Sequence, residues 1–449
     1  MNSIFIFADQ LQAFALGCAG NADASTPNLD ALAARGLLFG NCYSTAPLCT
    51  PFRACLFTGR YASQNGTLRN NDPLLPGERT LADCFAAASV EASYVGKWHL
   101  GASGSIAVPP ELRGGFKRFK GYQCYNDFLD EVAFFDEEGR RDDRPGHRTE
   151  ATTDIAIERL AEVAGKPFHL SVSYQNPHYP EQPSPEFEAL FKDAVIARRQ
   201  NSREIDPYTR TFSPPRAGES DPTWLRYHDD LNEYLRLYHA MVAQLDANIG
   251  RILAAVDRMG LAETTAIFFS SDHGDMQGSH GLKNKSSIYE ESAKVPLIAY
   301  LPGGVSGLRT DALCSTVDLM PTLLDLAGLP AEPSCEGRSL APLLYGRPFE
   351  APTEVFSEDD SNGSWFMIRD ARWKLAVDRA RDRPTHFFDM AADPFETTNL
   401  AEALASRDSG IGARDPARLA YDRLRERLPR LRADLLLRRN PASPKGKLL

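Results

Sequence analysis

The sequence predicts an α/β fold, in which a large mixed, mostly parallel sheet is sandwiched by helices. Two observations predict it: short, almost uninterrupted apolar runs, and longer segments of helical periodicity that alternate with them. Uninterrupted apolar runs are typical of strands that are buried on both faces. The strand-like runs lie near residues 3–8, 92–96, 168–173, 265–271 and 295–301. The helical patterns cover residues 27–35, 81–88, 151–163 and 234–258.

The pattern changes near residue 349, which predicts a second and smaller unit. Short apolar runs separated by turns favour a small antiparallel sheet there, followed by a C-terminal helix. These runs lie near residues 354–356, 365–368, 373–377 and 386–388. We therefore predict a large domain at residues 1–348 and a C-terminal subdomain at residues 349–449. The length favours this division, because single hydrophobic cores stop growing beyond about 250–300 residues.

Two further segments differ in composition from the rest of the chain. Residues 180–225 are rich in proline, arginine, serine and aspartate, which predicts a long loop over the mouth of a site. Residues 414–447 carry eleven basic and four acidic residues, with leucines at roughly helical spacing. Two interpretations of this last segment stay open: a helix packed on its own subunit, or an arm that joins copies of the chain into a homo-oligomer.

Charge and composition argue against several classes of partner. The formal net charge of −10 argues against nucleic acid, which is held by basic surfaces. No window approaches the roughly 18 continuous apolar residues of a membrane span, so no membrane partner is expected. The first strand is predicted to begin by residue 3, which leaves no room for a secretory signal, and we expect a cytoplasmic location. The eight cysteines lack the short paired spacing of a zinc site or a dense disulfide framework.

Acidic residues follow two of the predicted strands. Asp9 comes directly after the first apolar run, and Asp272 with His273 comes after the run at residues 265–271, just before a turn at Gly274. Open α/β sheets bind ligands at the carboxyl ends of their strands, so these side chains are candidate metal ligands. Taken singly, each acid could instead be a helix cap or a turn former.

The most informative segment is Cys49-Thr50-Pro51-Phe52-Arg53. A structural cysteine beside a proline turn is one interpretation, because free cysteine is often a small core hydrophobe. A thiol phosphatase is a second, but such enzymes need a longer loop between Cys and Arg to wrap a phosphate, and Arg53 follows Cys49 by only four positions. The segment instead resembles the maturation signature of type I sulfatases, a family of the alkaline phosphatase superfamily. In that family a formylglycine-generating enzyme oxidises the cysteine to formylglycine, whose hydrate offers one hydroxyl for attack and one for release.

Other segments resemble the same family, and the match extends from Asp9 to about residue 400. They are Gly96-Lys97-Trp98-His99-Leu100-Gly101, Asn176-Pro177-His178-Tyr179-Pro180, the stretch from Gly281 to Pro296 that contains Lys285, and the closing hairpin that begins at Phe387. The resemblance implies an alkaline-phosphatase-like fold with the catalytic domain at residues 1–348. It also implies hydrolysis of sulfate monoesters.

Departures from the family pattern refine this expectation. Many sulfatases place two aspartates at the first strand end, whereas Asp9 is followed by Gln10. Together with Asp-His later in the chain, this looks like the branch of choline sulfatases and phosphonate monoester hydrolases, which also keeps an asparagine at the position of Asn70. Phosphonate hydrolases replace the Lys-x-His pair, but this chain retains Lys97 and His99, which favours sulfate esters. A phosphonate monoester or phosphodiester hydrolase stays the alternative, and a non-catalytic binding protein is a third class.

The resemblance also implies a role for each site residue. The metal ligands would be Asp9, Cys49, Asp272 and His273, with Gln10 as a further candidate. Catalytic roles fall to Cys49, Arg53, Lys97, His99, His178 and Lys285, and substrate binding to Asn70 and Lys285. In this scheme His178 protonates the leaving group and His99 takes a proton from the remaining hydroxyl. Calcium is the favoured ion, with manganese and magnesium left open, and the substrate is a small aryl, sugar or aliphatic sulfate.

Overall fold

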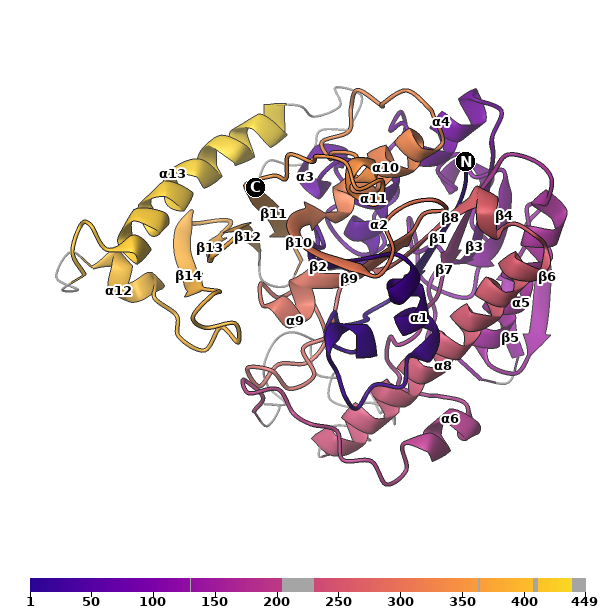
Figure 1. Ribbon diagram of the computed structural model, residues 1–449, viewed down its shortest axis with the longest axis horizontal. Helices are drawn as coiled ribbons and strands as arrows, with labels where there is room; N and C mark the ends of the chain where they lie inside the picture. The colour runs from indigo at the N-terminus through magenta and orange to yellow at the C-terminus, as the bar shows by residue number, and fades with distance from the viewer. Residues whose placement is uncertain (130, 204–229, 362–363, 407–410, 438–449) are drawn as a thin grey trace.

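The fold is built on one large central sheet with a smaller sheet at its side (Figure 1). The computed structural model describes residues 1–129, 131–203, 230–361, 364–406 and 411–437. The large sheet has ten strands in the order β10-β2-β9-β8-β1-β7-β3-β4-β5-β6. The strands are β1 (Asn2–Ala8), β2 (Leu37–Tyr43), β3 (Glu91–Lys97), β4 (Arg118–Tyr122), β5 (Glu131–Phe135), β6 (Arg141–Pro145), β7 (Phe168–Ser173), β8 (Thr265–Ser271), β9 (Lys294–Tyr300) and β10 (Leu308–Ser315).

Parallel pairing holds the centre of this sheet together. β1 pairs in parallel with both β7 and β8, and β3 pairs in parallel with β7 and β4. β9 is antiparallel to its neighbours β8 and β2, and β5 is antiparallel to β4 and β6. The predicted mixed, mostly parallel sheet is therefore confirmed.

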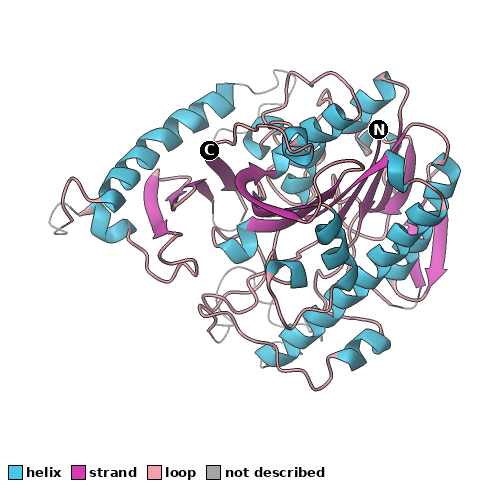
Figure 2. Ribbon diagram, in the orientation of Figure 1, coloured by secondary structure: helices cyan, strands magenta, loops and turns pink. Residues whose placement is uncertain are grey.

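Helices cover both faces of the large sheet, as Figure 2 shows. Alternate residues of β1 point to opposite faces, so Phe5 and Phe7 join one core and Ile4 and Ile6 join the other. The first core contains side chains of α2 (Cys49–Thr58), α4 (Leu81–Ala87) and α10 (Leu319–Leu326). The second contains side chains of α1 (Pro27–Arg35), α5 (Arg148–Val163) and α8 (Leu231–Arg258). Fully burying one large apolar side chain contributes about 1.5–3 kcal/mol, so both layers are held mainly by apolar contact.

The shorter helices lie in connections around this framework. They are α3 (Ala62–Asn65), α6 (Pro185–Leu190), α9 (Glu290–Ala293), α11 (Ala341–Leu344) and α12 (Ala401–Ala405).

The C-terminal part of the chain forms a second, antiparallel sheet. Its strands run in the order β11-β12-β13-β14, with bounds β11 (Glu354–Asp359), β12 (Trp365–Asp370), β13 (Trp373–Asp378) and β14 (Arg383–Asp389). Helix α13 (Pro416–Leu437) packs Leu424 and Leu428 against this sheet, next to Phe387. The intramolecular interpretation of the leucine-rich segment is thus confirmed for these two leucines. Homo-oligomer formation and the domain boundary at residue 349 stay predictions.

Five strands of the large sheet were not predicted from the sequence, namely β2, β4, β5, β6 and β10. β2 contains Gly40 and Asn41, and β10 contains Arg309 and Asp311, so neither reads as a continuous apolar run. β10 lies at the edge of the sheet, where polar side chains reach solvent. Of the long loop predicted at residues 180–225, residues 204–225 lie outside the described residues, and the described part contains the short helix α6.

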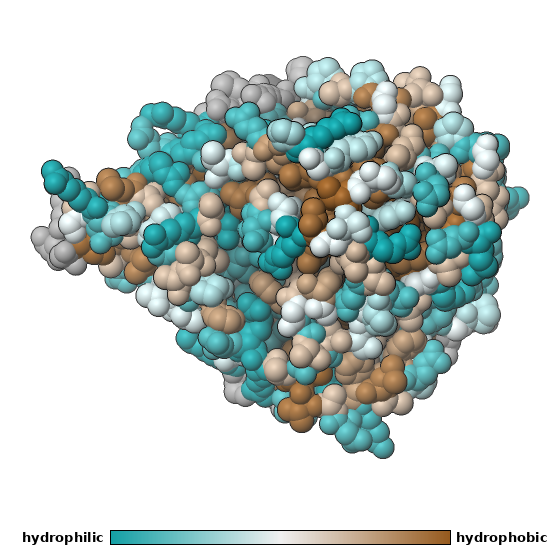
Figure 3. Space-filling model, viewed as in Figure 1, coloured by the Kyte–Doolittle hydropathy of each residue, from teal (hydrophilic) through white to brown (hydrophobic). Residues whose placement is uncertain are grey.

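The surface and the helices were compared with the hydropathy of the sequence. Figure 3 shows hydrophilic and hydrophobic side chains interspersed on the viewed face. Among the described helices, none is long and apolar enough to cross a membrane. All eight cysteines are free thiols.

A buried histidine in the sheet gives the fold a predicted sensitivity to acid. His169 in β7 lies between the hydroxyls of Ser3 and Ser171, at 2.8 and 2.9 Å, and stacks on Phe85. Burial lowers the pKa of His169 from 6.5 to about 3, so between these values the unfolded chain binds a proton that the folded protein does not. Stability contributed by neutral His169 is therefore complete above pH 6.5 and is lost as the pH falls, by about 1.4 kcal/mol per pH unit.

Urea unfolding at pH 7 and pH 4.5 measures this effect. We expect His169→Asn to lose less stability than the wild type between the two values, by about 2–3 kcal/mol. An equal loss in both proteins would show that another group controls acid unfolding.

Candidate active site

The site lies at the carboxyl ends of four neighbouring strands, β8, β1, β7 and β3. Asp272 follows β8 and Asp9 follows β1, and the ends of these strands are register partners. His178 lies in the loop that follows β7, and Lys97 is the last residue of β3. The sheet order alone thus brings together residues that are far apart in the sequence.

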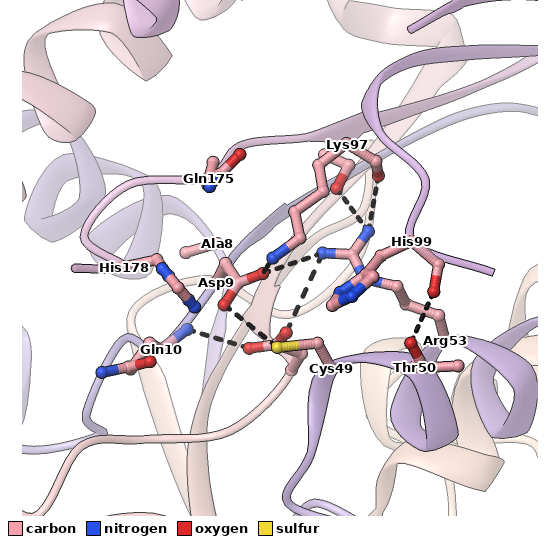
Figure 4. Close-up of polar contacts among 12 residues, drawn as sticks. Ala8, Asp9, Gln10, Cys49, Thr50, Arg53, Lys97, His99, Gln175 and His178 are labelled. Atoms are coloured by element: carbon pink, nitrogen blue, oxygen red, sulfur yellow. Dashed lines mark hydrogen bonds and ion pairs between the residues drawn. The ribbon is translucent and has the colours of Figure 1, made fainter. Parts of the chain in front are cut away.

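Cys49 approaches this edge from the first turn of α2, as Figure 4 shows. Its side chain is fully buried. The sulfur lies 3.3 Å from Nε2 of His273, 3.4 Å from Nζ of Lys285 and 3.6 Å from Oδ1 of Asp9. The N-terminus of a helix favours negative charge, so both α2 and Lys285 stabilise an anionic group at this position.

Arg53 lies one turn further along α2, on the same face of the helix as Cys49. Its Nη2 donates to Oδ2 of Asp9 at 3.2 Å, and its Nη1 donates to the carbonyl of Lys97 at 2.6 Å and to Oγ of Ser173 at 2.8 Å. The side chain is fully buried. These contacts fix the guanidinium between α2 and the ends of β1, β3 and β7.

Asp9 is the common partner of the positive charges in the site. It forms fully buried ion pairs with Lys97 and with Arg53. Burial alone would raise the pKa of Asp9, but Lys97, His178, Lys285 and Arg53 together lower it well below its usual range. The carboxylate is therefore ionised at neutral pH, and it keeps two cations close to Cys49.

Asp272 and His273 complete the carboxyl edge. Nδ1 of His273 lies 3.0 Å from the carbonyl of Gly274, which it reaches as a donor, so Nε2 is left as an acceptor facing the site. This Nε2 lies 3.4 Å from Oδ1 of Asp272. Burial, with the charge of Asp9 second, raises the pKa of Asp272 to about 7.

These residues fit a divalent cation. Asp9, Cys49, Asp272 and His273 each offer one ligand atom, and the four atoms lie within 4.8 Å of one another. Within the described part of the chain, Oδ2 of Asp272 has no hydrogen-bond partner although it is buried. Buried polar atoms are almost always paired, and two carboxylates with an imidazole are suitable ligands for a divalent ion.

Two histidines, His178 and His99, lie on opposite sides of Asp9 in the view of Figure 4. His178 packs its ring on Tyr179, with the ring centres 4.3 Å apart, and Figure 4 shows it beside Asp9. His99 has a left-handed backbone, with φ of 55°, and its Nδ1 has no hydrogen-bond partner among the residues described. Burial lowers the pKa of both histidines well below 6.5. Both rings are therefore neutral before a ligand binds.

Two of the predicted site residues make contacts that the sequence did not indicate. Oδ1 of Asn70 accepts from the backbone N–H of Thr50 at 3.2 Å, so this side chain caps the first turn of α2. Gln10 places its Oε1 2.8 Å from Nζ of Lys285. The substrate-binding role of Asn70 and the metal-ligand role of Gln10 stay predictions.

Three polar residues near the site were missing from the sequence-based assignment. The carboxylate of Asp275 and the amide of Asn284 both accept from the side chain of Gln10. Burial raises the pKa of the Cys124 thiol, and the charge of Lys97 partly offsets that rise. Asp275 follows Asp272 by only three positions, which is the one sequence signal that could have suggested it.

Comparison with known proteins identifies the family that this chain resembles. The model of the sulfatase family matches residues 1–329, and the model of the N-sulphoglucosamine sulphohydrolase C-terminal region matches residues 278–409. An ulvan-active sulfatase of Formosa agariphila is 31% identical, over 89% of this chain and 76% of its own. A choline-sulfatase of Rhizobium meliloti is 30% identical, over 89% of this chain and 82% of its own.

Solved structures share the fold over nearly the whole chain. One, a complex with its substrate D-glucosamine-2-N,6-O-disulfate, has a TM-score of 0.81 at 24% identity and covers 98% of this chain and 99% of its own. A phosphonate monoester hydrolase of Agrobacterium radiobacter has a TM-score of 0.76 at 25% identity and covers 97% of this chain and 96% of its own.

Fold and site together define a hydrolase of the alkaline-phosphatase-like class, with a nucleophile position, a cluster of cations and a candidate metal centre at one sheet edge. The chain belongs to the sulfatase family. It is a sulfuric ester hydrolase, and members of this family generally use a metal ion and formylglycine.

Proposed function

We propose that the protein hydrolyses sulfate monoesters through a nucleophile derived from Cys49, with a divalent metal ion beside it. The observation that carries the proposal is the position of the Cys49 sulfur, which lies between Lys285 at 3.4 Å and His273 at 3.3 Å. A structural cysteine would have apolar neighbours, as is usual for buried thiols. Cys49 instead contacts the charged groups of Lys285 and Asp9 and the imidazole of His273.

Conversion of Cys49 to formylglycine suits these surroundings. The hydrated aldehyde would supply one hydroxyl for attack on sulfur and a second for release of sulfate. Pro51 and Arg53 complete the pattern that a formylglycine-generating enzyme recognises, so such an enzyme is the proposed maturation partner.

The proposed metal ion is calcium, held by Asp9, Asp272, His273 and the modified residue 49. Oxygen-rich ligand sets favour calcium, whereas the imidazole would also suit manganese, and magnesium stays open. The bound ion would polarise a sulfate oxygen and lower the pKa of a nearby hydroxyl.

The remaining side chains would neutralise and orient the substrate. A sulfate ester is anionic, so an oxygen nucleophile can approach only where fixed positive charges offset that anion. Arg53 and Lys97 provide such charges next to Asp9, and Lys285 provides a third. For Lys285, burial alone would lower the pKa, but Cys49 and Asp9 outweigh it and the pKa is raised, so the ammonium keeps its charge.

Proton transfer falls to the two histidines. His99 is neutral and has an unpaired Nδ1 within the described structure, so it can accept a proton during release of sulfate. His178 would protonate the departing alkoxide. A bound sulfate would place negative charge beside His178 and raise its pKa, which opposes the effect of burial.

The substrate is proposed to be a small sulfated molecule, and sulfated sugars are the first class to test. One structural neighbour was solved with its substrate D-glucosamine-2-N,6-O-disulfate, which is a sulfated sugar. Aryl and aliphatic sulfates stay open. A screen of sulfated metabolites for released inorganic sulfate would identify the alcohol part.

Sulfate esters should be preferred over phosphonate esters. The fold is shared with a phosphonate monoester hydrolase, so that activity is the second candidate. Lys97 and His99 supply the positive charge and the base that suit release of sulfate. We expect kcat/KM for a nitrophenyl sulfate to exceed that for the matched phosphonate monoester by on the order of a hundredfold, about 2.7 kcal/mol of differential transition-state stabilisation.

Steady-state rates on the two esters test this preference. Replacing both Lys97 and His99 by alanine should shrink the gap between the two substrates. A wild-type enzyme that prefers the phosphonate would reverse the assignment in favour of the second candidate.

A further inference from the structure

The side-chain amide of Gln10 bridges two charged residues behind the nucleophile position. Its Nε2 donates to Oδ2 of Asp275 and, at 3.1 Å, to Oδ1 of Asn284. Its Oε1 accepts from Nζ of Lys285 at 2.8 Å. The same ammonium donates to the sulfur of Cys49 at 3.4 Å. A continuous chain of hydrogen bonds therefore runs from Asp275 to Cys49.

We propose that Asp275 is a positioning residue that acts through the amide of Gln10 to hold Lys285 against the nucleophile at position 49. The inference rests on the proposed function, in which Lys285 binds the sulfate group. Asp275 itself does not contact Lys285 or Cys49 by any hydrogen bond within the described structure.

The donors and acceptors around Gln10 allow only one orientation of its side-chain amide. Both carboxylate oxygens of Asp275 accept from N–H donors, Oδ2 from Gln10 and Oδ1 from Gln277, whereas the ammonium of Lys285 can only donate. The NH₂ group must therefore face Asp275, and the carbonyl oxygen must face Lys285. The flipped amide would place oxygen against carboxylate and NH₂ against ammonium, which leaves buried groups unsatisfied and costs several kcal/mol, on the order of 1–3 for each group.

Two members of this hydrogen-bonded chain, Asp275 and Gln10, are held by contacts with the backbone. Oδ1 of Asp275 accepts from the N–H of Gln277 at 2.9 Å, which fixes the carboxylate. Gln10 has a left-handed backbone, with φ of 70°, and its N–H donates to Oδ1 of Asp272 at 2.9 Å. All of these side chains are buried, so water does not compete for the hydrogen bonds. The side chain of Lys285 is long and has several rotatable bonds. Its hydrogen bond to Oε1 of Gln10 restricts the position of the ammonium.

Removing the negative charge of Asp275 tests the proposal. Asp275→Asn keeps the shape but offers an amide that can donate or accept, so the amide of Gln10 is no longer forced into one orientation. We expect the affinity for inorganic sulfate, measured by calorimetry, to fall about tenfold, and kcat/KM for nitrophenyl sulfate to fall about a hundredfold, as for outer partners of site residues in general. Unchanged sulfate affinity and unchanged kcat/KM would overturn the proposal.

Exchanging the two groups provides the sharper test. In Gln10→Glu with Asp275→Asn, the amide at position 275 can donate to the carboxylate at position 10, which can still accept from Lys285. Gln10→Glu alone places two carboxylates together and is expected to lose sulfate binding. We expect the double variant to bind sulfate at least about tenfold more tightly than either single variant, whereas independent sites would show additive losses. Additive losses would overturn the proposal.

A buried carboxylate elsewhere controls for a merely structural effect. Asp246 is buried and accepts from the backbone N–H groups of Asn28 and Leu29. Asp246→Asn should lower the unfolding temperature and leave the sulfate affinity unchanged. An equal loss of sulfate affinity in both Asn variants would overturn the positioning role.

Sulfate affinity and kcat/KM are measured separately, so a failure of this proposal can be distinguished from a failure of the proposed function. A wild type that binds sulfate but hydrolyses no sulfate ester would contradict the function, and the exchange test would still be decided by sulfate binding. If Asp275→Asn alone does not fold, a folded, sulfate-binding double variant supports the proposal. A double variant that also fails to fold, or that folds without binding sulfate, overturns it.

Discussion

Cys49→Ala is expected to abolish sulfate ester turnover, with kcat/KM at least about 10⁴-fold below that of the wild type. The Cys49 sulfur lies 3.4 Å from Nζ of Lys285 and 3.3 Å from Nε2 of His273, and alanine leaves no nucleophile in its place. The fold should survive, because losing one buried sulfur costs only about 1 kcal/mol. Steady-state hydrolysis of nitrophenyl sulfate, with thermal unfolding of the same samples, measures both effects. Cys49→Ser keeps a single hydroxyl, so one turnover followed by arrest is expected.

Cys55 provides a matched control on the same helix. It is also fully buried in α2, but it belongs to a different cluster, with Ala46 and Val317. Cys55→Ala should lose comparable stability and keep its activity. Peptide mass spectrometry across residues 49–60 tests the modification itself. Fully active enzyme that contains only unmodified cysteine at position 49 would contradict the proposal.

The central strands could be predicted because their sequences have a single interpretation. β7 and β8 are buried along their length and were predicted with the bounds that the structure shows, Phe168–Ser173 and Thr265–Ser271. Burial on both faces removes the need for alternation, so such runs are easily recognised. β10 has charged residues at its exposed end, and its strand conformation depends on pairing with β2. That pairing is tertiary and is not encoded in a local pattern.

The candidate site could be predicted to the extent that each residue ends a predicted strand or belongs to a motif. Asp9 and Asp272 needed only the rule that ligands bind at carboxyl ends of strands. The contact between Gln10 and Asp275 joins residues 265 positions apart, and no spacing rule indicates it. For Asn70 a motif position indicated substrate binding, which stays a prediction, and it gave no sign that Oδ1 also caps the backbone of α2.

Asp272→Ala is expected to remove the bound divalent ion and the activity together. The site holds the carboxylates of Asp9 and Asp272 against the cations Arg53, Lys97 and Lys285. Without Asp272, one carboxylate would face three cations, which strongly disfavours a divalent ion at that position. We expect metal affinity to fall at least about a hundredfold and kcat/KM to fall by on the order of 10³-fold.

Elemental analysis of the purified wild type and variant, dialysed against the same calcium concentration, measures metal occupancy. Asp318 offers a matched control, because it is a buried carboxylate that accepts from the backbone N–H groups of Ser315 and Arg338, away from the metal cluster. Asp318→Ala should lose stability yet keep both calcium and activity per folded molecule. Oδ2 of Asp272 is buried and has no hydrogen-bond partner in the described structure. In metal-free protein, Asp272→Ala should therefore lower the stability less than Asp318→Ala does. Full metal occupancy in Asp272→Ala would place the metal site elsewhere in the protein.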